Sequence, residues 1–252
     1  MRLNELFEQP GKTVAVNFGR MNPPTIGHEK LVGVILKQKA DAHFLFVSQT
    51  EKLTGKNKTR RDNPIPFSIK LGLVKKAFSN IPIGDTSANT VIKMMQLLES
   101  QGYKNVIYVC GQDRVPEFET LLKNQNGIDY NFDSIEIVSS GDRDPDAEGA
   151  EGMSASKMRQ AAIDDDFDSF KLGVPTNLQG NAEEIFSMLR KYLEPWIEEN
   201  IKSEEYADEH IGKVQGGYRL YSKSGGKNLG TYPTRAGAEK RERQVQYFKH
   251  KG

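Results

Sequence analysis

The chain has 252 residues, and 37% of them are hydrophobic, which is enough for a packed core. No apolar run approaches the roughly 18 residues that a membrane span needs, and residues 1–7 do not resemble a signal peptide. The single cysteine, Cys110, excludes an intramolecular disulfide and a cysteine-based zinc site. We therefore expect a cytoplasmic protein that does not bind membranes, and its net charge of +1 combines +8 in residues 212–252 with −7 in the rest.

The first predicted elements are a strand and a helix joined by a loop. Residues 13–18 are apolar and partly β-branched, which is typical of a buried parallel strand, and a helical pattern with one apolar face follows. The loop over residues 19–28 places Gly27 and His28 in the first helical turn, where unpaired backbone N–H groups favour an anion. The sequence therefore predicts a phosphate site, although it has neither the Gly-Lys-Ser/Thr ending of a P-loop nor the three spaced glycines of a dinucleotide site.

The rest of the first 200 residues alternates strands with helices, which predicts an α/β fold with a parallel sheet and helices on both faces. Further strands are expected at residues 42–48, 105–110 and 134–139, with a short edge strand at 81–83. Helices are expected from residue 87, from Ser154, over 181–199, and after residue 63, the last with Ile69, Leu73, Val74, Ala77 and Phe78 toward the core. The cations of the polar loop at 49–63 are either phosphate ligands or a solvated charge run.

A carboxylate and a guanidinium follow the strand at residues 105–110. Because parallel sheets bind ligands at the carboxyl ends of their strands, we interpret Gly111, Asp113 and Arg114 as ligand-binding groups. The alternative is that Asp113 caps the next helix and that Arg114 is merely exposed. Cys110, which ends the strand, is interpreted as a small core residue.

Two motifs resemble the signature of the nucleotidyltransferase superfamily. Residues 19–28, Gly-Arg-Met-Asn-Pro-Pro-Thr-Ile-Gly-His, contain its T/HxGH motif with Thr25 first and His28 last, and residues 152–159, Gly-Met-Ser-Ala-Ser-Lys-Met-Arg, resemble its SSTxxR-type segment. The resemblance covers residues 1–200 and implies a Rossmann-like sheet of about five strands. Structural roles are the alternative, with His28 and Ser154 capping the helices that they begin.

The resemblance implies nucleotidyl transfer, in which an acceptor oxygen attacks the α-phosphorus of a nucleoside triphosphate and pyrophosphate leaves. The implied catalytic residues are His28, Thr25, Arg20 and Arg159, and the implied cofactor is Mg²⁺, which is bound with the triphosphate and not by a metal site of the protein. The implied nucleotide-binding residues are Phe18, Gly19, Arg20, Met21, Asn22, Gly27, His28, Gly111, Asp113, Arg114, Ser154, Ser156 and Arg159.

The acceptor is suggested by a second resemblance. Residues 47–70 are similar to nicotinamide mononucleotide adenylyltransferases of the archaeal type, with Ser48-Gln49, then Asn63-Pro64 and Phe67, and with Lys70 where an arginine is expected. This implies ATP and nicotinamide mononucleotide as substrates and NAD as the product. Phosphopantetheine, FMN or a cytidylyltransferase substrate remains open as the small phosphate-bearing acceptor.

The basic tail is expected to form a unit of its own. Residues 212–252 hold 10 Lys and Arg and 2 Asp and Glu, whereas the rest holds 25 and 32, so we place a linker at 201–211 and a small ββα unit after it. Nucleic-acid binding and a small core are the two interpretations of its aromatic residues, which are Tyr218, Tyr221, Tyr232, Tyr247 and Phe248. The tail is similar to segments of bacteriophage proteins, which implies a host-cytoplasm location and leaves open a non-catalytic, nucleic-acid-binding or virion-associated protein.

Overall fold

The computed structural model describes residues 11–49, 62–141, 153–221 and 228–241. The chain divides into two compact units, Met1–Leu193 and Glu194–Gly252. The sequence placed this boundary a few residues later, at residue 200. In the described part of the chain, no helix is long and apolar enough to cross a membrane.

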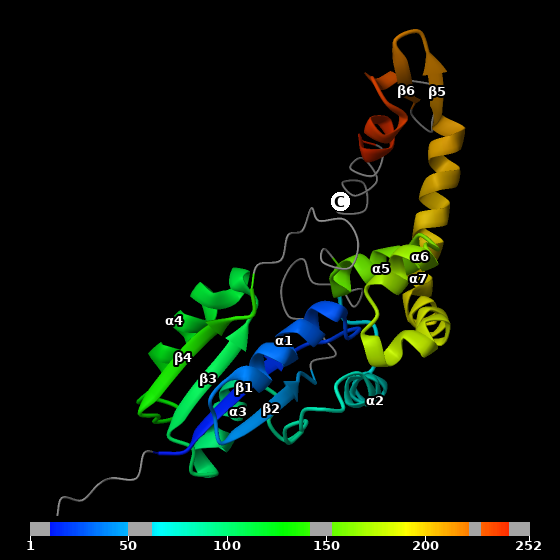
Figure 1. Cartoon of the computed structure of the whole chain (residues 1–252). Coiled ribbons are helices and arrows are strands. Elements are labelled where there is room, and N and C mark those ends of the chain that lie inside the picture. The colour runs from blue at the N-terminus through cyan, green and yellow to red at the C-terminus, as the bar shows by residue number, and fades with distance from the viewer. Residues whose placement is uncertain (1–10, 50–61, 142–152, 222–227, 242–252) are drawn as a thin grey trace, which may run out of the picture. The chain divides into compact units, whose positions relative to one another are not determined.

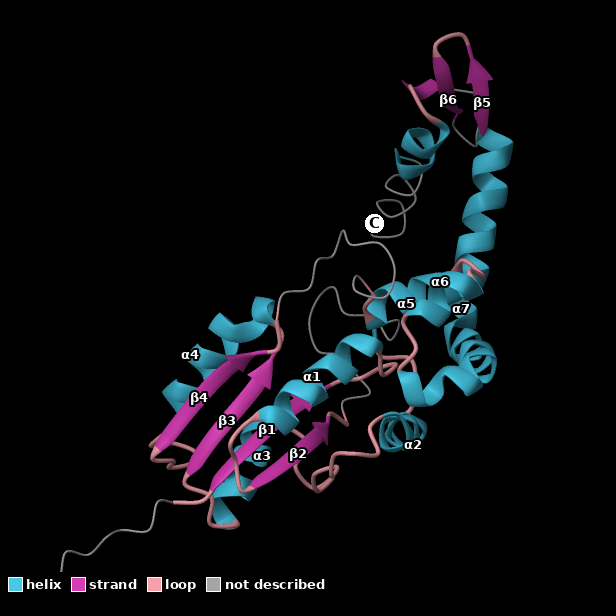
Figure 2. Ribbon diagram, in the orientation of Figure 1, coloured by secondary structure: helices cyan, strands magenta, loops and turns pink. Residues whose placement is uncertain are grey.

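The first unit is built on a parallel sheet, as the alternating pattern predicted (Figures 1 and 2). Its strands lie in the order β2-β1-β3-β4, and every neighbouring pair is parallel. Their bounds are Thr13–Gly19 for β1, Ala42–Val47 for β2, Asn105–Cys110 for β3 and Ser134–Ser139 for β4. The prediction of a Rossmann-like α/β fold is confirmed.

The expected fifth strand is reduced to one bridge. Leu45 of β2 pairs with Ile83 in parallel, and the Leu45 N–H donates to the carbonyl oxygen of Pro82 at 3.0 Å. The Gly84 N–H returns a bond to the carbonyl oxygen of Leu45 at 2.9 Å. Pro82 has no N–H to donate, so this segment contributes two hydrogen bonds and no continuous ladder. The described sheet therefore has four strands rather than about five.

Helices cover both faces of the sheet, with α1 in front and α3 behind in the view of Figure 2. The helices of the first unit are α1 (Ile26–Lys37), α2 (Phe67–Ala77), α3 (Val91–Ser100), α4 (Val115–Gln125), α5 (Ala155–Ile163), α6 (Phe167–Leu172) and the first part of α7 (Ala182–His210). Short 3₁₀ turns at Gln112–Arg114 and Thr176–Asn181 precede α4 and α7.

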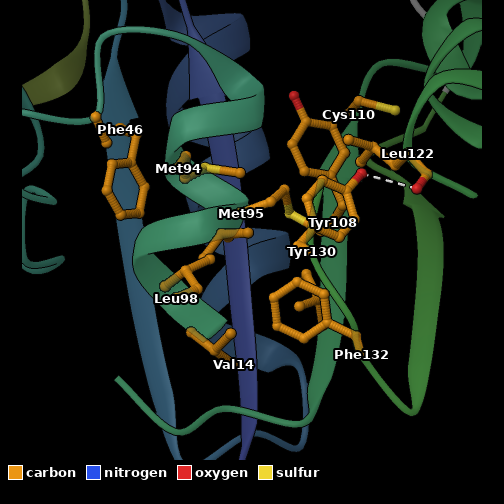
Figure 3. Close-up of a cluster of buried hydrophobic side chains, with 13 residues drawn as sticks. Val14, Phe46, Met94, Met95, Leu98, Tyr108, Cys110, Leu122, Tyr130 and Phe132 are labelled. Carbon is orange, nitrogen blue, oxygen red and sulfur yellow. Dashed lines mark hydrogen bonds between the residues drawn. The ribbon is translucent and has the colours of Figure 1, made fainter. Parts of the chain in front are cut away.

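The core behind the sheet is formed where alternate strand residues meet α3 and α4 (Figure 3). Val14 and Val16 point to this side, because side chains alternate along a strand, and they pack with the fully buried Met94 and Met95. The prediction that these methionines fill the core is confirmed. The cluster consists of Val14, Val16, Phe46, Ala88, Met94, Met95, Leu98, Val106, Tyr108, Cys110, Leu122, Tyr130 and Phe132.

Helix α2 buries Val74, Ala77 and Phe78 as the sequence predicted, but it does not bury Ile69. Ile69 is 37% exposed, whereas Lys70 is 1% exposed and lies on the buried stripe with Val74 and Ala77. The Lys70 Nζ donates to the carbonyl oxygen of Ser48 at 2.6 Å, and this acceptor at the end of β2 allows a lysine to be buried. The prediction that Ile69 faces the core is therefore wrong.

The single thiol gives a direct probe of this core. Cys110 is 2% exposed, and burial raises its pKa to about 11. The thiolate is the reactive form, so alkylation of the folded protein by iodoacetamide at pH 8 should be about a hundredfold slower than in denaturant, as measured by mass spectrometry. Because the unfolded thiol ionises first, the free energy of unfolding should fall as the pH rises from about 9 to about 11. Equal labelling rates in the two states would contradict a buried Cys110.

The second unit contains the end of α7, which runs to His210, and three antiparallel strands. The strands are β5 (Ile211–Val214), β6 (Gly217–Tyr221) and β7 (Asn228–Tyr232), and a helix follows over residues 235–241. The predicted linker at 201–211 is thus helical up to His210, because its charged residues and alanine favour helix and it contains no glycine or proline. The tail is a βββα unit rather than ββα, since Ile211–Val214 pairs with β6.

Candidate functional site

The carboxyl edge of the sheet carries the first predicted motif. Thr25 is the N-cap of α1, and its side chain and that of His28 form a reciprocal capping box. The His28 Nδ1 accepts the backbone N–H of Thr25 at 3.0 Å and lies 2.9 Å from the Thr25 Oγ1. The capping role that the sequence left open for His28 is therefore present.

The capping box also determines which ring nitrogen of His28 carries the proton. Because Nδ1 of His28 accepts a backbone N–H, the neutral imidazole carries its proton on Nε2. This assignment follows from the hydrogen bond to Thr25 and not from observed hydrogens. His28 can therefore cap α1 through Nδ1 and act as a hydrogen-bond donor through Nε2, so the structural and functional interpretations are compatible.

The first turn of α1 is only partly available to an anion. The Ile26 N–H donates to the carbonyl oxygen of Gly173 at 2.9 Å, and the His28 N–H bonds back to the Thr25 carbonyl. The Gly27 N–H has no hydrogen-bond acceptor among the residues that the structure describes. Arg20, exposed on the same loop, has no hydrogen-bond or ion-pair partner within that part of the chain either. The groups of this turn that an anion could meet are thus the Gly27 N–H, Arg20 and the His28 side chain.

Asn22, which the sequence placed in the nucleotide site, is hydrogen-bonded within the protein. It is 1% exposed, and its amide holds the segment before α2. The Asn22 Nδ2 donates to the Ile65 carbonyl oxygen at 2.9 Å, and the Ile65 N–H donates to the Asn22 Oδ1 at 3.1 Å. Nδ2 also donates to the Asn63 Oδ1. Asn22 therefore fixes the loop after β1 to the chain that enters α2.

Arg159 joins the two motifs by bonding to Asn22, 137 residues away in sequence. Its Nη1 donates to the carbonyl oxygen of Asn22 at 2.7 Å, and its Nη2 donates to the Ser156 Oγ at 3.0 Å. The Asp62 Oδ1 lies 3.7 Å from Nη2. With only 6% of its surface exposed, Arg159 is engaged with the protein and orients the loop, whereas the sequence assigned it to phosphate. We call these contacts the Arg159 bridge.

The second motif begins α5. Ser154 is the N-cap, and its Oγ accepts the Lys157 N–H at 3.1 Å, so the capping role that the sequence left open is present here too. The backbone N–H groups of Ala155 and Ser156 have no acceptor among the described residues, and Ser156 is exposed. Through the Arg159 bridge this helix start lies beside the loop after β1, as Figure 1 also shows for α1 and α5.

Three further predicted residues of the first loop support its shape. Met21 is 1% exposed and has a φ of 49°, a left-handed conformation that is uncommon for a residue other than glycine. A Cβ on Gly19 would lie 3.0 Å from the Met21 Cε and 3.1 Å from the Asn17 Oδ1. Gly19 therefore allows a close approach of these two side chains to the backbone, and Phe18 packs against the core behind the sheet.

In the loop after β3, the predicted ligand groups Asp113 and Arg114 point in different directions. Gly111 permits the Asp113 carboxylate to fold back, because a Cβ on Gly111 would lie 2.7 Å from the Asp113 Oδ1. The Arg114 Nε pairs with the Glu117 Oε2 at 2.8 Å, and its guanidinium lies 5.2 Å from the ring centre of Phe118. Arg114 is thus turned along α4, which agrees with the alternative that it is an exposed residue. Asp113 stays at the edge of the sheet.

The sequence undervalued two buried polar side chains at this edge. The Asn17 Nδ2 donates to the Val109 carbonyl oxygen at 2.8 Å and so ties β1 to β3, and Lys70 holds the end of β2 through Ser48. A polar residue inside the apolar run of β1 was the available signal for Asn17. The cations at Lys52, Lys56, Lys58, Arg60 and Arg61 lie outside the described residues.

The described residues contain no group of three or more His, Cys, Asp or Glu side chains that could hold a metal ion. A divalent cation at this edge would therefore need ligands from the substrate or from the parts of the chain that the structure does not describe. Phosphate oxygens are common ligands of Mg²⁺ in such sites.

Fold and site together define a parallel α/β protein in which two helix starts meet at the carboxyl edge of the sheet. No family model matches the chain, and no curated protein sequence matches it. Solved structures similar to it include a protein of Vibrio parahaemolyticus described provisionally as a nicotinate-nucleotide adenylyltransferase, with 15% identity, a TM-score of 0.46, and coverage of 68% of this chain and 98% of that one.

Two structures of nicotinic acid mononucleotide adenylyltransferase from Plasmodium falciparum are also similar. The one complexed with NaAD has 12% identity and a TM-score of 0.46, and the one complexed with APC has 13% identity and a TM-score of 0.45. Each similarity covers 73% of this chain and 96% of the other.

Proposed function

We propose that the chain is a nucleotidyltransferase that transfers a nucleoside monophosphate from a nucleoside triphosphate to a small phosphate-bearing acceptor. With ATP and nicotinamide mononucleotide the products would be NAD and pyrophosphate. The supporting observation is the Arg159 bridge, which holds the Thr25–His28 turn beside the start of α5. Two helix starts at one strand edge suit a polyphosphate, because each presents N–H groups to an anion.

The proposed reaction needs no nucleophile from the protein. A phosphate oxygen of the acceptor attacks the α-phosphorus, the bond from that phosphorus to the bridging oxygen breaks, and the electron pair leaves with pyrophosphate. The His28 Nε2–H would donate to a phosphate oxygen as negative charge develops, with Arg20 and the Gly27 N–H as further donors. The free N–H groups of Ala155 and Ser156 would hold the leaving phosphates.

The contacts of Arg159 support a role other than the phosphate contact that the sequence suggested. Its donors to Asn22 and Ser156 make it a positioning residue that keeps both helix starts at the required separation. Mg²⁺ would neutralise charge on the phosphates when it is bound with the triphosphate. The protein groups near that position, His28 and Arg20, supply donors and positive charge rather than metal ligands.

The direct test is to measure pyrophosphate release from ATP and Mg²⁺ with nicotinamide mononucleotide, and to identify NAD by mass spectrometry. The expected result is equal amounts of the two products. If product formed from FMN, phosphopantetheine or a CTP-dependent acceptor but not from nicotinamide mononucleotide, the proposed acceptor would be wrong and the proposed type of reaction would be right. If no acceptor led to pyrophosphate release, the proposed nucleotidyltransferase activity would be refuted.

A further inference from the structure

The small sheet of the second unit has two different faces. One face forms the core of this unit, where Ile211, Leu220 and Ala238 are buried. Tyr218 and Tyr232 are opposite one another in β6 and β7 and pack against the same core. These two tyrosines therefore fill the interior, as one interpretation of the sequence predicted.

The opposite face carries residues that the core does not use. Gly212 pairs with Arg219, and Arg219 pairs with Thr231, so these three residues lie in a row across the strands. Tyr221 lies two residues along from Arg219, and a Cβ on Gly212 would be 3.2 Å from the Tyr221 Cε2. The tyrosine ring therefore lies over a glycine. We name Gly212, Arg219, Tyr221 and Thr231 the Arg219 face.

The chemistry of the Arg219 face is cationic and aromatic. The Arg219 Nε donates to the Thr231 Oγ1 at 3.3 Å, and no carboxylate pairs with Arg219 within the residues that the structure describes. In the same part of the chain, no aromatic ring or cation stacks on Tyr221. A guanidinium and a ring separated by two residues of one strand stand roughly 7 Å apart. Both side chains are partly exposed.

We propose that the Arg219 face binds single-stranded nucleic acid, with a phosphate on Arg219 and a base stacked on Tyr221. The excess of 10 Lys and Arg over 2 Asp and Glu in residues 212–252 complements a polyanion. An acidic peptide would pair with the positive charge of Arg219 but offers no partner that stacks on the Tyr221 ring. Every nucleic-acid base, in contrast, has a π-face that stacks on an aromatic side chain. A duplex keeps these base faces covered by its own stacking, so unpaired strands are the ligand. This proposal does not depend on the proposed transferase reaction.

The test uses the full-length chain and fluorescein-labelled 12-residue oligonucleotides, dT12 and rU12, with a 12-base-pair duplex and poly-glutamate as comparison ligands. Tyr221→Leu keeps apolar bulk over Gly212 but removes the stacking ring, and it should weaken dT12 binding about tenfold in fluorescence anisotropy. Arg219→Gln should weaken binding and lower the slope of log affinity against log salt by about 0.7. A preference for rU12 over dT12 would identify RNA as the better ligand.

Two variants serve as matched controls. Lys213→Gln removes one charge from the neighbouring strand, but Lys213 pairs with Tyr218 and so belongs to the other face; it should change dT12 affinity by less than about threefold. Tyr221→Phe keeps the ring and should bind as the wild type does. Circular dichroism checks folding, and if Tyr221→Leu is unfolded, Arg219→Gln against Lys213→Gln decides. Equal affinities for Arg219→Gln and Lys213→Gln, equal binding of the duplex or poly-glutamate, or no binding at low salt would overturn the proposal.

Discussion

Replacing His28 with asparagine is expected to lower kcat for pyrophosphate release by about a hundredfold or more, as for the loss of one preorganised donor to developing negative charge. Asparagine can place its Oδ1 where the His28 Nδ1 now accepts the Thr25 N–H, so the capping box is preserved. The Nε2–H has no equivalent in asparagine. The substitution therefore separates the proposed catalytic donor from the structural cap of α1.

His28→Ala is the matched comparison, because it removes both functions. It should lose turnover to a similar extent and, in addition, about 1 kcal/mol of stability, which is typical for the loss of a helix cap. Turnover is measured with ATP, Mg²⁺ and nicotinamide mononucleotide, and stability by urea unfolding. If His28→Asn turned over at the wild-type rate, His28 would be only a capping residue. An unstable His28→Asn would mean that asparagine does not preserve the cap.

The order of strands and helices along the chain could be predicted from the sequence because the signals for each element are local. Alternating strand and helix patterns predict a parallel sheet, and the loop between β1 and α1 carries its turn chemistry within ten residues. The fifth strand was overestimated, since Pro82 has no N–H with which to extend the ladder along β2. Composition also suggested a linker at 201–211, yet helix-forming residues continue α7 to His210.

The orientation of polar side chains could not be predicted from the motifs. The T/HxGH-type segment can be recognised in the sequence, but the hydrogen bonds from Asn22 to Ile65 and from Arg159 to Asn22 join residues that are far apart in it. Likewise, polarity alone predicts that Ile69 is buried and Lys70 exposed. The opposite is observed, because the Ser48 carbonyl oxygen accepts a hydrogen bond from the buried Lys70. Such buried polar contacts form only in the tertiary structure, and each must satisfy a specific partner.

The second large expected effect is on stability, for Asn22→Ala. This change removes the amide that bonds both the N–H and the carbonyl oxygen of Ile65, which is 2% exposed. A buried backbone group left without a partner costs about 1–3 kcal/mol, so the variant should lose about 3 kcal/mol of unfolding free energy in urea. For a unit of this size the corresponding fall in Tm is about 10 °C.

The control for that variant is Asn124→Ala, since Asn124 is exposed on α4 and its side chain makes no hydrogen bond to the residues that the structure describes. The unfolding free energy of this control should change by less than about 0.5 kcal/mol. Asn22→Asp sharpens the result, because aspartate still accepts the Ile65 N–H but turns an anion toward the Ile65 carbonyl oxygen, and it should be no more stable than Asn22→Ala at pH 7. Arg159 bonds the backbone carbonyl of residue 22, so both variants keep the Arg159 bridge. A change below about 1 kcal/mol for Asn22→Ala would mean that water replaces the amide at the two backbone groups of Ile65.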